Sequence, residues 1–162
     1  MDVSHCFNAF RGLREVNIAA SEFGADGWMT GNFAKILSAA TDLQTLAFFF
    51  GYLDLSLFHK TRFRHYDLTC LIFSAAGFYQ GELLDLLRRH SATLLEVQLL
   101  DIHLINGSWT VLLEGMKSYL SLQNIRIDWS TEEDDDEGEE VDVVIEQSAL
   151  QKYLGDGPHP LS

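Results

Sequence analysis

The stretch LLEVQLLDIHL, residues 94–104, carries the pattern that decides the fold. Its apolar and polar residues alternate around Val97 and Leu99, which is typical of a short strand with one buried face. The same L-x-x-L-x-L pattern, with Val, Ile or Phe allowed for Leu, starts at residues 13, 43, 68, 94 and 122, which are 30, 25, 26 and 28 residues apart. This spacing lies within or just beyond the range of leucine-rich repeats. The five copies are Leu13-Val16-Ile18, Leu43-Leu46-Phe48, Leu68-Leu71-Phe73, Leu94-Val97-Leu99 and Leu122-Ile125-Ile127.

Helix-like stretches separate these strands. Apolar residues recur three and four positions apart within residues 33–37, 83–87 and 112–116, so each stretch has an apolar stripe. One strand and one helix cannot cover their own apolar surface, and the repeats must therefore stack. The sequence predicts an α/β leucine-rich-repeat solenoid of about five strand-turn-helix repeats, with a parallel concave sheet and the helices outside. In four copies a further apolar residue follows the pattern, whereas the fifth has Glu132; the four are Phe23, Leu53, Phe78 and Leu104.

Several segments resemble a known family. ELLDLLRRH (residues 82–90), TLLEVQL (93–99), GSW (107–109) and the ending YLGDGPHPL (153–161) are similar to the leucine-rich-repeat half of fungal F-box-like proteins. The resemblance covers roughly residues 13–161. It implies repeats that recognise a protein, and an N-terminal F-box that links the protein to a cullin-type ubiquitin ligase. No F-box is visible, because residues 1–12 are too few for its helices. The ninth repeat position is never asparagine, which predicts an irregular solenoid; it holds Ser21, Gly51, Ala76, Ile102 and Ser130.

The chain divides into four expected parts. Residues 1–12 read as an N-terminal remnant or cap, residues 13–130 as the leucine-rich repeats, and residues 141–162 as a C-terminal cap and tail. Between the last two, residues 131–140 hold eight carboxylates and no basic residue. Like charges gain nothing from burial, so we expect an acidic loop there and expect residues 132–140 to be dispensable for folding.

Composition excludes several classes of protein. The net charge of −13 argues against nucleic-acid binding, which depends on neutralising phosphates. The longest apolar run is far too short for a membrane span, and no signal sequence opens the chain, so we expect no membrane association and an intracellular location, cytoplasmic or nuclear. Two cysteines are too few for a disulfide scaffold or a four-cysteine zinc module.

Residues that could perform chemistry do not occur in recognisable combinations. The six histidines lack the spacing of a metal site, and there is no G-x-S-x-G nucleophile motif and no phosphate-binding glycine loop. Cys70 reads as a small residue on a strand surface. We therefore expect no enzyme, no cofactor and no bound metal.

What remains is the surface of the sheet. Side chains that flank the second leucine of each strand point away from the core. A curved sheet that mixes aromatic residues with separated charges is suited to binding a protein. We expect a noncatalytic protein-interaction module, with substrate recognition in an F-box-type ubiquitin ligase as its context. On the strands, the expected concave binding face contains Glu15, Asn17, Thr45, Ile72, Glu96, Gln98 and Arg126, with Ala47, Cys70 and Asn124 beside them. Just beyond the strands, it is extended by Phe49, Asp101, Asp128 and Trp129, with Leu100 beside them.

Two other functions stay open. The phrase EFGADG (residues 22–27) and the late acidic run are similar to leucine-rich-repeat regulators of small GTPases. An enzyme of unrecognised type is the third possibility. The partner is a protein whose identity the sequence does not reveal, with ubiquitin-ligase components among the candidates if a longer form carries an F-box.

Overall fold

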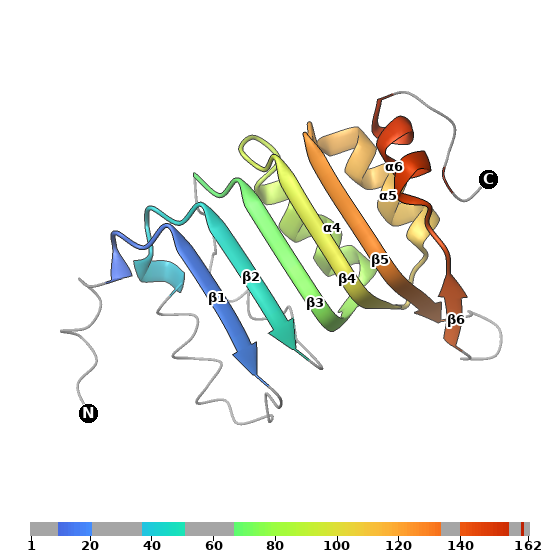
Figure 1. Ribbon diagram of the computed structural model, residues 1–162, viewed down its shortest axis with the longest axis horizontal. Coiled ribbons are helices and arrows are strands. Elements are labelled where there is room, and N and C mark those ends of the chain that lie inside the picture. The colour runs from blue at the N-terminus through green and yellow to red at the C-terminus, as the bar shows by residue number, and fades with distance from the viewer. Residues whose placement is uncertain (1–9, 21–36, 51–66, 134–139, 156–159, 161–162) are drawn as a thin grey trace.

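The computed structural model describes residues 10–20, 37–50, 67–133, 140–155 and 160. Within them the chain forms a mixed α/β structure built on one six-stranded sheet (Figure 1). In chain order the elements are β1 (Glu15–Ala20), β2 (Thr45–Phe50), β3 (Cys70–Tyr79), α4 (Gln80–Arg89), β4 (Glu96–Ile105), α5 (Trp109–Tyr119), β5 (Asn124–Glu133), β6 (Glu140–Val143) and α6 (Gln147–Leu154).

The sheet is mostly parallel, and its strands lie in chain order from β1 to β6. Strands β1 to β5 pair in parallel, each beside its predecessor, as the sequence predicts. The register aligns the five copies of the sequence pattern, so that the second apolar residues lie side by side: Val16, Leu46, Leu71, Val97 and Ile125. Strand β6 adds an antiparallel edge to β5 that the sequence analysis did not predict.

The turn before each strand is also repeated. At each step, two successive backbone N–H groups donate to one carbonyl of the preceding strand or its approach. Arg14 O accepts from Gln44 and Thr45, and Thr69 O accepts from Leu95 and Glu96 at distances of 2.8–2.9 Å. The same arrangement is found at Gln44 O and Leu95 O. One local geometry therefore starts four strands.

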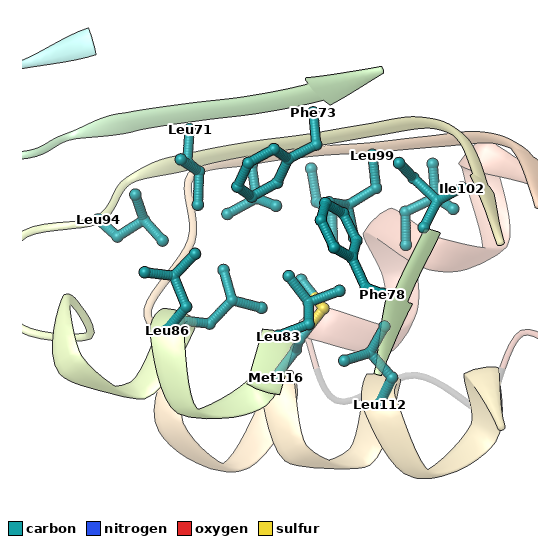
Figure 2. Packing of buried hydrophobic residues seen from close by; sticks show 14 of the residues in the cluster. Leu71, Phe73, Phe78, Leu83, Leu86, Leu94, Leu99, Ile102, Leu112 and Met116 are labelled. Carbon is teal, nitrogen blue, oxygen red and sulfur yellow. The ribbon is translucent and has the colours of Figure 1, made fainter. Parts of the chain in front are cut away.

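The core lies between the sheet and the helices, which cover one of its faces (Figure 1). Figure 2 shows side chains of β3 and β4 pointing toward those of α4 and α5. Phe73 stacks on Phe48 with ring centroids 5.5 Å apart and meets Phe78 edge-on at 4.8 Å. The helices contribute the buried residues that their apolar stripes predict, Leu83, Leu86, Leu87, Leu112, Leu113 and Met116.

Strands β3, β4 and β5 are longer than the sequence pattern indicates. Each runs for 10 residues through a kink at its sixth residue, where Ala75, Asp101 and Trp129 have φ of 55°, 55° and 56°. Register pairs on both sides of the kink keep the three residues at one level. The backbone changes direction there and continues, so the further apolar residues Phe78 and Leu104 are buried within the strands. Phe23 and Leu53 lie outside the described residues.

Two expectations require correction. The acidic loop was expected over residues 131–140, but residues 131–133 belong to β5 and Glu140 begins β6, because the kinked strand continues into the acidic segment and pairs there. Ala47 was expected on the open surface and is buried, because its methyl group lies in register between the longer side chains of Asn17 and Ile72.

Candidate functional site

The face of the sheet opposite the helices is covered by none of the described elements (Figure 1). Every residue of the expected binding face lies on a strand, and none is buried. We call these residues and their neighbours in register the open face. Phe49, Asp101, Asp128 and Trp129 were expected just beyond the strands, but they lie within them because the strands are longer.

The register arranges the open face in rows that run across the strands. The first row holds Glu15, Thr45, Cys70, Glu96 and Asn124. The second holds Asn17, Ala47, Ile72, Gln98 and Arg126, and the third holds Ala19, Phe49, Ser74, Leu100 and Asp128. Asp101 and Trp129 lie at the kink beyond the third row. The structure thus brings together residues that are more than a hundred positions apart in the sequence.

Three pairs of polar side chains on the open face are held together along their own strands. Asn17 Nδ2 donates to Glu15 Oε1, and Gln98 Nε2 donates to Glu96 Oε1, both at 2.7 Å. Arg126 Nε forms an ion pair with Asp128 Oδ2 at 2.6 Å. Each pair is two residues apart, which places both side chains on one face of the strand. These bonds restrict the side chains before any partner binds, and so reduce the entropy lost on binding.

Cys70 lies in the first row, and its surroundings do not suit a nucleophile. Burial, and after it the nearby carboxylates of Glu96 and Glu15, together raise the pKa of its thiol to about 11. The thiol is therefore protonated at neutral pH, whereas a reactive cysteine needs a thiolate. Among the described residues, no three His, Cys, Asp or Glu side chains are grouped so as to hold a metal ion.

Large apolar side chains are exposed beside the charged ones. Phe49 is 42% exposed and Trp129 is 86% exposed, although both side chains are apolar and would, by residue type alone, be expected in the core.

The alternation of buried and exposed residues is interrupted at the kinks. Asp128 and Trp129 are consecutive and both lie outside the core, while the next residue, Ser130, is buried. The same break in alternation occurs at Leu100 and Asp101. In β4 the break is visible in the sequence, because the apolar positions shift from Leu99 to Ile102 and Leu104; in β5 the apolar Trp129 continues the alternation and hides it.

A cluster at the carboxyl ends of the strands supports helix α5. Glu132 Oε2 accepts from Trp109 N at 2.7 Å, Thr131 O accepts from the indole of Trp109 at 3.0 Å, and Gln80 Oε1 accepts from Ser108 N at 2.7 Å. Gly107 is required here, because a Cβ at that position would overlap the Gln80 side chain. We assign this cluster a structural role.

No protein-family model, curated protein or solved structure matches the chain. In the described part of the chain, no helix is long and apolar enough to cross a membrane. Residues 22–27, which carry the likeness to regulators of small GTPases, lie outside the described residues.

Proposed function

We propose that the chain is an irregular leucine-rich-repeat solenoid whose open face binds a protein partner without catalysis. Support for the solenoid comes from three features that recur along the chain: the register of the apolar pattern, the turn before each strand, and the left-handed kink. Recurrence of a unit that packs only on its neighbours is what defines such folds.

One observation carries the proposed binding function. An extended face of the sheet combines exposed aromatic side chains with carboxylates that are already held by hydrogen bonds. Protein interfaces favour aromatic anchors surrounded by polar groups, and rigid side chains lose less entropy on binding. The proposed context is substrate recognition for an F-box-type ubiquitin ligase, which rests on the resemblance of residues 82–109 and 153–161 to fungal F-box-like proteins.

Affinity capture with matched variants tests the binding function. The full chain, a Phe49→Ser/Trp129→Ser variant of the open face and a Val144→Ser control would be used as baits, and captured proteins would be identified by mass spectrometry. Val144 is 81% exposed but follows β6, away from the rows of the open face. We expect a set of proteins that the wild type and the control retain and the open-face variant loses.

The results of the affinity capture test the binding function separately from the proposed role in an F-box-type ubiquitin ligase. Cullin-type scaffold or adaptor proteins within that set would support the ligase context, and their absence would contradict it. If all three baits captured the same proteins, the open face would not be the binding surface and the proposed function would be wrong.

A further inference from the structure

The kinks in β4 and β5 place two unlike side chains next to each other on the open face. Asp101 and Trp129 are at the same level of adjacent strands, between the register pairs Leu100↔Asp128 and Ile102↔Ser130. Neighbouring strands are about 4.8 Å apart, so a carboxylate and an indole emerge side by side. They are separated by 28 residues of sequence, and only the register of the sheet brings them together.

Asp101 differs from the other carboxylates of the open face. Glu15, Glu96 and Asp128 each accept a hydrogen bond from a side chain of their own strand. Within the described part of the chain, Asp101 has no such bond and its side chain is exposed. Its charge is therefore available to a ligand.

Trp129 destabilises the fold through backbone strain that its exposed indole does not offset. A bulky residue in the left-handed region is strained, whereas aspartate adopts this conformation more readily. The kink does not require tryptophan, since Ala75 and Asp101 occupy the equivalent positions. An indole that is 86% exposed also gains little from packing against the described core. Strain retained at an exposed aromatic residue suggests a role in binding.

We propose that Asp101 and Trp129 together bind an arginine side chain of a basic segment in the protein partner. A guanidinium group can lie flat on an indole and donate to a carboxylate beside it, which a lysine ammonium does less well. This inference rests on the proposed binding function and specifies the chemistry of the partner.

The charge of the open face favours the same partner. The open face carries four carboxylates and one base, a net charge of −3; these residues are Glu15, Glu96, Asp101, Asp128 and Arg126. The whole chain carries −13. A negative surface raises the rate at which a cationic partner associates and disfavours acidic competitors.

A labelled model peptide tests the proposal with the full chain. The probe is fluorescein-labelled Ser-Leu-Arg-Leu-Arg-Leu-Ser, and its analogues carry lysine or uncharged citrulline in place of arginine. Binding is measured by fluorescence anisotropy at low salt. We expect saturable binding of the arginine peptide, weaker binding of the lysine peptide and the weakest binding of the citrulline peptide.

Two variants remove the site without disturbing the kink. Asp101→Asn and Trp129→Asn both introduce a residue that tolerates positive φ. Each should weaken binding of the arginine peptide by about two- to fivefold, the range expected for one exposed cation–π contact or ion pair. The matched controls are Asp142→Asn and Val144→Asn, which change exposed residues on and beside β6 and should leave the affinity unchanged. Thermal melts check that all four variants fold.

Three results would overturn the inference: no saturable binding of the arginine peptide, equal affinity for the arginine and lysine peptides, or an equal loss from Asp142→Asn and Asp101→Asn. The last would mean that the peptide responds only to overall charge. If affinity capture depends on Trp129 while the arginine peptide does not bind, the proposed function stands and only the arginine site is wrong.

Discussion

At the residue scale, the left-handed positions in the strands are the least expected feature of the chain. Ala75, Asp101 and Trp129 are not glycine, yet all three have φ near 55°. Each is followed by a buried residue, Ala76, Ile102 or Ser130. The kink therefore resets the alternation of the strand, so that a second buried segment follows the first in register with the core. Burial of that segment offsets the local backbone strain.

Glycine substitution tests this account of the kink. Ala75→Gly should leave the free energy of unfolding unchanged or raise it by up to about 1 kcal/mol, because relief of left-handed strain offsets the greater flexibility of glycine in the unfolded chain. Ala76→Gly is the control one residue later; it should lower stability by about 1–2 kcal/mol through the lost methyl group and strand propensity. Urea denaturation measures both. A larger loss from Ala75→Gly than from Ala76→Gly would show that the kink is not strained.

Cys70 supplies a prediction about pH. Its thiol has a pKa of about 11 instead of 9.0, first because of burial and then because of Glu96 and Glu15. In a Cys6→Ser background, the rate of alkylation by iodoacetamide should approach half its maximum near pH 11. Glu96→Gln should move that midpoint toward lower pH by removing a like charge.

The same pKa shift affects stability. The folded chain holds the thiol proton more tightly than the unfolded chain, so this contribution is present below pH 9 and is lost as the pH rises toward 11. The destabilisation over that range should be smaller in Cys70→Ala than in the parent chain. An alkylation midpoint near pH 9 would contradict the described environment of Cys70.

At the scale of the elements, the ends of helices depend on residues from other elements. Ser108 is the N-cap of α5, and its Oγ accepts from Val111 N at 3.4 Å, while Glu132 of β5 accepts from Trp109 N. A carboxylate at a helix N-terminus satisfies a free N–H group and interacts favourably with the helix dipole. The first glutamate of the acidic segment thus has a structural role that its composition does not suggest.

Glu132 is therefore expected to contribute to the free energy of unfolding, unlike residues 134–139 of the acidic segment. Glu132→Ala should lower the free energy of unfolding by about 1 kcal/mol, and Glu132→Gln by less, because the amide oxygen still accepts a hydrogen bond. Replacement of residues 134–139 by a Gly/Ser linker is the control and should leave stability nearly unchanged. Chemical denaturation at moderate salt compares the three. If Glu132→Ala were as neutral as the linker, the contact with α5 would have no energetic value.

The free edge of β5 is covered by two neighbouring elements, β6 and α6. Residues Ser130 to Glu133 of β5 pair with β6. In the first half of β5, before this pairing begins, the backbone forms hydrogen bonds with side chains of α6. Gln147 and Gln151 both donate to Ile125 O, and Gln147 Oε1 accepts from Ile127 N. Satisfying these groups removes an exposed strand edge that could pair with other chains.

At the scale of the whole molecule, stability depends on stacking along the sheet. Leu71 is fully buried near the start of β3, in register with Leu46 and Val97 on the flanking strands. Leu71→Ala should lower the free energy of unfolding by about 2–5 kcal/mol, because the cavity affects neighbours on both sides.

Two exposed substitutions serve as controls for Leu71→Ala. Leu95→Ala makes the same change at a residue that is 38% exposed, and Glu96→Ala changes an open-face residue; each should stay within about 0.5 kcal/mol. Equilibrium unfolding in urea compares the three variants. A neutral Leu71→Ala, or a strongly destabilising Glu96→Ala, would mean that the strand register is wrong by one residue.

The sequence by itself determined the periodic part of the structure. Apolar spacing around Val16, Leu46, Leu71, Val97 and Ile125 predicted five strands, their parallel order and the buried stripes of α4 and α5, because burial of one face imposes a period on the chain. The same alternation identified the outward-facing side chains of seven residues of the expected binding face. The other four, Phe49, Asp101, Asp128 and Trp129, were expected just beyond the strands and are also not buried.

Only the tertiary structure decided the features that join distant residues. The kink at Trp129, the pairing of β5 with β6 and the contact between Glu132 and Trp109 leave no periodic signal. Each of these features has a local free-energy cost, either backbone strain or the partial burial of a charge. Contacts from another strand or helix offset that cost. A single segment does not contain those contacts, so its sequence indicates the cost and not what offsets it.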